Sequence, residues 1–120
     1  MIGRFYAKVA ALVLVAGTAS AQAPGMDEAV AAAKNQLGVL EFCQAEGHID
    51  GKAVEIQQKM FGQLPAPSDA AKVEAAYEKG KAGTVSAMGV EQSLKEASAS
   101  QNTDISALCK QMAAVITQAG

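Results

Sequence analysis

The 120-residue sequence predicts an all-α protein, a small bundle of four to five short helices stapled by one disulfide after an N-terminal signal peptide. Apolar residues recur at the three-and-four spacing of helices that bury one face. Glycine, proline and capping residues separate these periodic segments. The length suits one domain, so we expect residues 1–21 to be the signal peptide and residues 22–120 to form a single small helical domain.

The first twenty residues have the order of a secretory signal. Arg4 and Lys8 precede an apolar run over residues 9–16, and small residues including Ala19 and Ala21 follow it. This order is typical of a signal peptide with a small-x-small cleavage site, and the run is about half the ~20 residues that a membrane helix needs. We predict cleavage after Ala21 and a periplasmic or secreted location.

Removal of this segment changes the charge of the chain. The ten basic residues fall to eight lysines against twelve acids, so the formal charge moves from −2 to −4 and no arginine remains. The loss of arginine argues against bidentate phosphate recognition. The three remaining aromatic residues, Phe42, Phe61 and Tyr77, offer little for base stacking. We therefore expect no nucleic-acid partner.

Two helices are predicted in the first half of the mature chain. The first begins at Met26 and ends at Gly47, with Gly38 as an interruption that only packing explains. The second is capped by Asp50 and ends at Pro65, because a residue before proline avoids helical angles. Their expected buried faces contain Val30, Ala33, Leu37, Leu40, Ala53, Val54, Met60, Phe61 and Leu64.

Three further helices are predicted after the prolines. Ser68 is the expected cap of a helix over residues 69–79, and residues 80–84 form a flexible break. Residues 84–86 can be extended, but one such run does not make a sheet. A helix over residues 90–99 is expected next. Thr103 or Asn102 caps the last helix. The expected inward residues are Val73, Ala76, Tyr77, Val90, Leu94, Ala97, Ile105, Leu108, Cys109, Met112, Val115 and Ile116.

The two cysteines, Cys43 and Cys109, are separated by 66 positions and lie on apolar faces of different predicted helices. In an exported protein this pattern favours a structural disulfide. Free or intermolecular thiols and a catalytic pair are the alternatives. A redox centre usually has the Cys-x-x-Cys spacing, and a metal site needs more ligands than the chain supplies.

No coherent catalytic set is found. His48 is the single histidine, and its neighbours Glu46 and Asp50 lack a second His or Cys at ligand spacing. No nucleophile elbow is present, and residues 80–84 lack the order of a phosphate-binding loop. We therefore expect neither a catalytic residue nor a metal or other cofactor, and we expect that the protein is not an enzyme.

Four segments carry a family resemblance: residues 34–47, 64–67, 81–85 and 107–112. They resemble a family of small exported proteins of Gram-negative bacteria labelled "pore-forming, early-secreted-antigen-like". The resemblance implies a helical fold and a cysteine pair matching Cys43 and Cys109. It brings no catalytic residues.

Function is expected to be non-enzymatic and to consist of binding or assembly, with an unknown protein partner or self-association. One alternative is a membrane-active, pore-forming oligomer, as the resemblance implies. However, the amphipathic last helix carries only Lys110 as a basic residue, whereas membrane-surface helices have a basic polar face. A small periplasmic stress chaperone is the third hypothesis.

Overall fold

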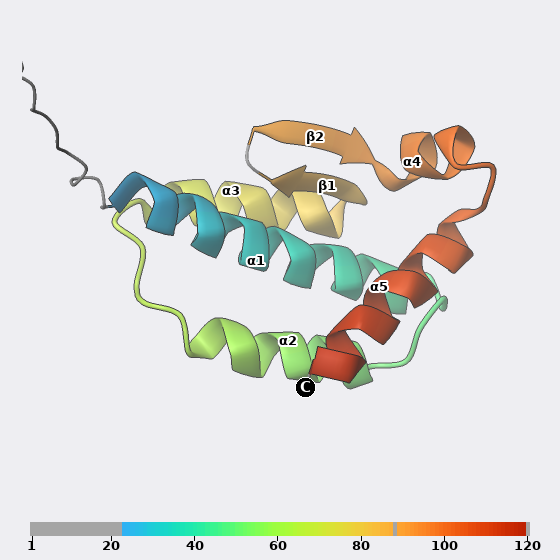
Figure 1. Cartoon of the computed structure of the whole chain (residues 1–120), viewed down its shortest axis with the longest axis horizontal. Coiled ribbons are helices and arrows are strands. Elements are labelled where there is room, and N and C mark those ends of the chain that lie inside the picture. The colour runs from blue at the N-terminus through green and yellow to red at the C-terminus, as the bar shows by residue number, and fades with distance from the viewer. Residues whose placement is uncertain (1–22, 88, 120) are drawn as a thin grey trace, which may run out of the picture.

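The computed structural model describes residues 23–87 and 89–119, which form five helices and one two-stranded antiparallel sheet (Figure 1). The elements are α1 (Ala23–Ala45), α2 (Lys52–Gly62), α3 (Ala70–Lys81), β1 (Thr84–Ala87), β2 (Val90–Ser93), α4 (Leu94–Ser100) and α5 (Ile105–Ala119). The mainly helical fold is confirmed. The all-α class is wrong, because β1 and β2 form a hairpin. The expected signal peptide, with Ala19 and Ala21, lies outside the described residues.

Helix α1 is the central element, with α2 on one side and α3 and the hairpin on the other (Figure 1). It begins at Ala23, three residues before the expected start, and its last residue is Ala45, two residues before the predicted end at Gly47. Gly47 has a φ of +82°, a conformation that glycine adopts without steric cost. The amide of His48 donates to the Cys43 carbonyl and the amide of Gly47 to the Gln44 carbonyl, which is the Schellman ending of a helix.

Helices α1 and α3 touch backbone to backbone at Gly38 and Gly80. A Cβ atom at Gly38 would lie 2.5 Å from the Tyr77 carbonyl oxygen, and one at Gly80 would lie 2.3 Å from the Asn35 carbonyl oxygen. Gly38 therefore has the packing role expected of it. The expectation that Gly80 belongs to a flexible break is wrong, because this residue is buried inside α3 and the chain turns only at Gly83.

Helix α2 packs against α1 and α5 with a narrower apolar face than the sequence predicts. Ala53 and Val54 are buried as expected, but Met60 and Leu64 are exposed. The third fully covered residue is Gln57, whose side-chain amide donates to the Ala33 carbonyl at 3.1 Å. The apolar periodicity therefore overestimated the contact made by the last turn of this helix.

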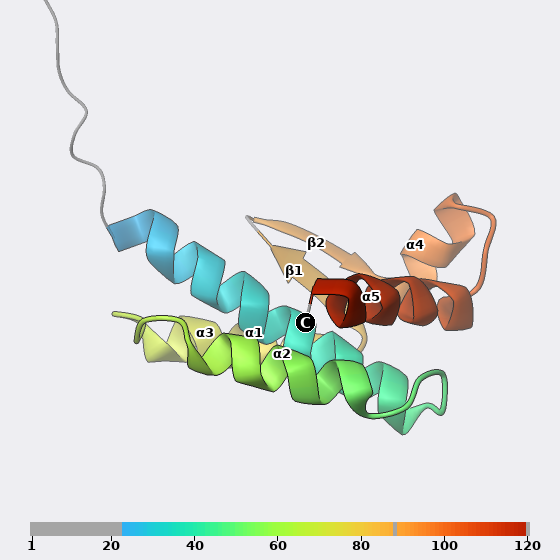
Figure 2. The ribbon, with the colours of Figure 1, turned by 60° about the horizontal axis from the view of Figure 1, so that its bottom comes forward.

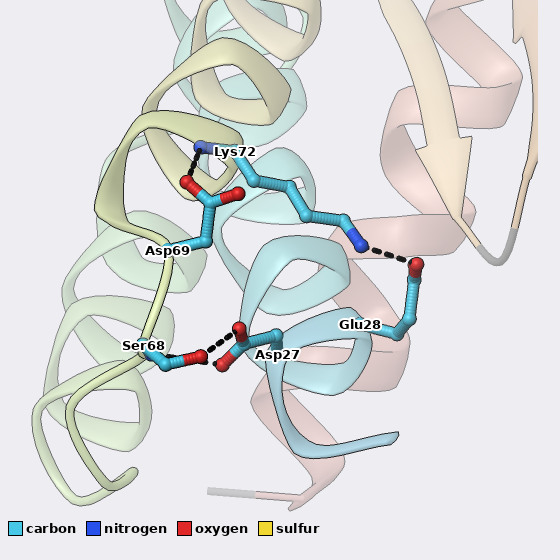
Figure 3. Close-up of polar contacts among 5 residues, drawn as sticks. All are labelled: Asp27, Glu28, Ser68, Asp69 and Lys72. Atoms are coloured by element: carbon cyan, nitrogen blue, oxygen red, sulfur yellow. Dashed lines mark hydrogen bonds and ion pairs between the residues drawn. The ribbon is translucent and has the colours of Figure 1, made fainter. Parts of the chain in front are cut away.

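Helix α3 is capped by Asp69, not by Ser68 as predicted. The Asp69 carboxylate accepts from the Lys72 amide at 3.1 Å, and Ser68 instead bonds to Asp27 of α1 (Figure 3). Both residue types are good caps, so the choice depends on the tertiary contact with α1. Val73 and Ala76 are buried as expected, and Tyr77 is half-buried.

The hairpin replaces the first turn of the helix expected over residues 90–99. β1 pairs with β2 in the register Thr84 opposite Ser93 and Ala87 opposite Val90. Gly89, at the turn, has a φ of +82°, which suits tight hairpin connections. The sequence prediction failed here because the second run, Val90–Ser93, has a single apolar residue and so no strand-like apolar pattern. That residue, Val90, is 68 % exposed in the structure.

Polar residues define both ends of α4 and the start of α5. Ser93 and Glu96 form a reciprocal capping box at the start of α4. Asn102, with a φ of +54°, ends α4, and Asp104 caps α5 by accepting from the Ala107 amide at 2.8 Å. The prediction that Asn102 or Thr103 caps the last helix is therefore wrong by one or two positions.

The core joins α1, the first described helix, to α5, the last. Cys43 of α1 and Cys109 of α5 are completely buried, and their sulfur atoms lie at disulfide distance, with 5.7 Å between the Cα atoms. Val39, Leu94 and Leu108 pack around this pair. Helix α5 is thereby fixed across α1, with its C-terminal part against α2 (Figure 2).

Candidate binding groove

An apolar depression runs between α1, the hairpin and α5. It consists of two adjoining cavities of about 290 and 440 Å³, which share Val85, Ala87 and Met112. We call it the apolar groove. Its other lining residues are Ala29, Ala32, Ala33, Asn35, Gln36, Val90, Gln92, Leu94, Ala97, Gln101, Leu108 and Gln111.

The hairpin supplies one wall because its side chains alternate between two faces. The strand residues that line the groove are Val85, Ala87, Val90 and Gln92. The alternate residues are polar and face away from it: Thr84, Ser86, Glu91 and Ser93. On this polar side Glu91 forms an ion pair with Lys79 of α3. The short, weakly patterned strands thus present an apolar surface to the groove and a polar one to α3.

Asn35 holds this wall in position. Its side chain is 1 % exposed and its amide donates to the carbonyls of Ala76 and Thr84 at 2.9 and 3.0 Å. Its side-chain oxygen accepts from the Ser86 amide at 2.9 Å. Because an isolated two-stranded hairpin is only marginally stable, these bonds from α1 to α3 and β1 are a major restraint on the groove.

No lining residue of the groove carries a charge. The twelve acids and eight lysines of residues 22–120 all lie elsewhere on the chain. The polar members of the lining are the amides of Asn35 and four glutamines. Ligand sites generally combine apolar walls with a few polar groups that fix orientation, and the groove has that composition.

Apolar side chains remain exposed at the rim. Val90 of β2 lines the groove and is 68 % exposed, and Val115 of α5 is 63 % exposed, one turn beyond the groove residue Met112. The expectation that Val90 and Val115 point into the core is therefore wrong. The expectation that Met112 belongs to the core is correct in part, because it packs against buried residues and also lines the groove.

The loop around His48 has no site geometry. His48 is half-buried and its backbone completes the end of α1, whereas Asp50 accepts from the Lys52 amide at 3.0 Å. Across residues 23–87 and 89–119, no group of three or more His, Cys, Asp or Glu side chains could hold a metal ion. In the same residues, no helix is long and apolar enough to cross a membrane.

A polar cluster joins the first described turns of α1 to the start of α3 (Figure 3). The Ser68 hydroxyl donates to Asp27 at 2.5 Å, and the Lys72 ammonium donates to Glu28 at 2.5 Å. The Ser68 bonds lower the pKa of Asp27, and the bond to Glu28 raises the pKa of Lys72. Asp27 is thus bonded to the segment just before α3, and Glu28 is paired with Lys72 of α3, which indicates a docking contact between α1 and the start of α3.

A second perturbed group lies between the same helices. The Tyr77 hydroxyl donates to the Glu41 carboxylate at 2.5 Å. This hydrogen bond, together with partial burial, raises the pKa of Tyr77 to about 12. The ammonium groups of Lys34 and Lys81 lie 4.4 and 4.8 Å from the centroid of the Tyr77 ring, so two lysines make cation–π contacts with it. The bond between Tyr77 and Glu41 is an interhelical contact of α1 and α3.

Of the candidate site residues predicted from the sequence, Cys43 and Cys109 lie within the described part of the chain, and the structure brings this pair together. Asn35 and the apolar groove were not predicted from the sequence. An asparagine inside an otherwise Ala-rich helix is the one local feature that could have drawn attention to this position, since Asn is a poor helix former. The groove itself depends on the hairpin, which the sequence pattern did not reveal.

Comparison with known proteins adds no identification. A scan against known families, a search of curated proteins and a search of solved structures each find no match to the chain. The family resemblance stays a prediction, and the geometry of the site carries the functional argument.

Proposed function

We propose that this is a non-enzymatic, exported protein that acts by binding or assembly, with the apolar groove as the site that takes an apolar surface of a polypeptide. The single observation that carries the proposal is the uncharged groove with exposed Val90 at its rim. Apolar area that is removed from water contributes about 25 cal/mol per Å², so an apolar segment gains affinity by entering it.

The polar lining supports a polypeptide as the occupant. Gln36, Gln92, Gln101 and Gln111 each provide amide donors and an acceptor. Peptide groups carry the same donor and acceptor functions, so the glutamines suit a backbone that passes over the groove. An ionic ligand would leave its charge without a counter-ion in this lining, which is costly.

The proposal includes export through a cleaved signal peptide. Its support is the order of charges and apolar residues in the first twenty-one positions and the buried Cys43–Cys109 pair, which suits an oxidising compartment. Intact mass of the protein recovered from the periplasm or medium tests both points. The expected chain begins at Gln22 and is two hydrogens lighter than the reduced form.

Binding is tested by fluorescence anisotropy with a labelled, short, uncharged peptide rich in Leu and Val. The processed chain is expected to give saturable binding. Ala29 is an exposed lining residue near the start of α1, and Ala29→Glu places a charge at the groove, so the affinity is expected to fall at least about tenfold.

Ala71→Glu is the matched control. Ala71 is exposed in the first turn of α3 and lies outside the groove, so the same change of charge and volume there is expected to leave peptide affinity unchanged. Equal loss in both variants, or no saturable binding of the peptide by the unaltered chain, would contradict the proposed site.

A further inference from the structure

We infer that the occupant of the apolar groove is a second copy of this chain, in a two-fold symmetric dimer that buries the groove of each protomer. The inference rests on the proposed function and adds the identity of the partner. It is drawn from three features of the groove and its rim: the absence of charge, the self-complementary polar groups and the uncharged outer face of α5.

The charge distribution permits self-association through this surface. Residues 22–120 carry a formal charge of −4, so two copies repel one another. In a two-fold interface each residue patch meets the same patch of the partner, so a patch that carries a single sign of charge would face its own sign. The groove is lined entirely by uncharged side chains, which keeps the repelling groups at the periphery where salt screens them.

The glutamines give the interface a polar complement that can pair with itself. A lysine cannot bond to a lysine, nor a carboxylate to a carboxylate, whereas an amide is both donor and acceptor. Gln92 of β2, Gln101 after α4 and Gln111 of α5 are exposed around the cavity of about 290 Å³. Their arrangement therefore suits an identical surface better than an acidic or basic partner.

The outer face of α5 extends the same surface. From Gln111 to Ala119 this helix has no charged residue, although Gln111, Ala114, Val115 and Gln118 are exposed. Solvent-facing sides of surface helices normally carry charges. Val115, which is 63 % exposed, and Val90 of β2 supply the apolar side chains that the partner's groove would cover.

Sedimentation velocity of the oxidised, processed chain tests the inference over a concentration range from about 1 μM to 1 mM. A reversible monomer–dimer equilibrium is expected. Val90→Glu is expected to weaken the dimer at least about tenfold, because it places two carboxylates in one uncharged interface. Gln58→Glu, an equal charge change at an exposed position of α2, is the matched control and is expected to leave the dissociation constant unchanged.

Gln111→Glu is a second variant at an exposed helix position, so the test does not depend on the stability of the hairpin. Raising the salt concentration is expected to strengthen the wild-type dimer, because the net charges repel and no interfacial ion pair is lost. A chain that stays monomeric to 1 mM, a dimer that Val90→Glu and Gln111→Glu leave intact, or a dimer that salt dissociates would each overturn the inference.

The outcomes separate this inference from the proposed function. If the chain is monomeric but binds the uncharged peptide, the groove is a site for a different polypeptide and only the second-copy inference fails. If neither a dimer nor peptide binding is found, both fail. If both are found, the peptide is expected to compete with dimer formation, since the two share the groove.

Discussion

Replacement of Gly80 by alanine tests the backbone contact on which the α1–α3 pair is built. The added Cβ would lie 2.3 Å from the Asn35 carbonyl oxygen and 2.8 Å from the Val39 amide nitrogen, whereas ordinary contacts begin at 3.4 Å. Both neighbours are backbone atoms inside α1 and cannot rotate away. The helices therefore have to separate by about 1 Å, which loosens the tightly packed interface.

The change in the free energy of unfolding expected for Gly80→Ala follows from two opposing effects. Overpacking costs up to about 3 kcal/mol, and the replacement of a helical glycine by alanine returns about 1 kcal/mol. The expected loss is about 2 kcal/mol, which corresponds to a decrease in Tm of about 8–16 °C for a domain of this size. Thermal unfolding followed by circular dichroism at 222 nm measures it.

Gly62→Ala is the matched control. Gly62 is also helical, at the end of α2, and no atom lies within 4 Å of a Cβ built there. This variant is expected to melt at or slightly above the wild-type temperature. The reasoning is refuted if Gly80→Ala melts within about 2 °C of Gly62→Ala, because both changes then act through propensity alone.

Three further predictions concern the restraints on this fold. Reduction of the disulfide between α1 and α5 is expected to lower the free energy of unfolding by about 4 kcal/mol in urea titrations, since it closes a 66-residue separation; equal unfolding midpoints with and without reductant would contradict this. The raised pKa of Tyr77, about 12 against an ordinary 10.0, means that the protonated phenol stabilises the fold below pH 10 and that this contribution is lost as the pH rises from 10 to 12. Phenolate absorbance of the processed chain is expected to titrate near pH 12, and Glu41→Gln is expected to lower this midpoint; an unchanged midpoint would exclude the carboxylate as the cause. Asn35→Leu leaves the Ser86 amide without its acceptor, so hydrogen exchange at Ser86 is expected to accelerate at least about tenfold. Retained protection of this amide would show that the hairpin is stable without the Asn35 hydrogen bonds.

The helices could be predicted where their signals are local. Gly47 and the proline pair around Ala66 report helix ends through backbone chemistry alone, and the predicted boundaries lie within a few residues of the observed ones. The prediction that Asp50 caps the second helix is wrong by one position, because the N-cap of α2 is Gly51. The apolar stripe of the last helix also placed Cys109 on the buried face, opposite Cys43. These features depend on sequence neighbours and therefore appear in a pattern.

The features that could not be predicted from the sequence depend on contacts between distant segments. Gly80 is interpreted as a helix breaker unless its backbone contact with Gly38 is known. Ser68 is interpreted as a helix cap unless its hydrogen bond to Asp27 is known. The hairpin has only two four-residue strands, of which the second, Val90–Ser93, is mostly exposed. Its stabilising partner is a side chain 49 positions upstream of Thr84, so no local pattern predicts it, and the groove that it forms was missed with it.

The bonds of Asn35 also decide how this small sheet can be extended. The Leu94 amide donates to the Gly83 carbonyl, and the alternation of an antiparallel ladder then turns the backbone groups of Thr84 and Ser86 outward on β1. Asn35 bonds to both, so an incoming strand cannot pair with this edge.

On β2 the Ser93 amide donates to Glu96, and only Glu91 keeps an open backbone donor, next to its own negative charge. Unprotected edges are templates for cross-β polymerisation. Copies of this chain that meet at high concentration should therefore associate through side chains in preference to adding strands into fibrils.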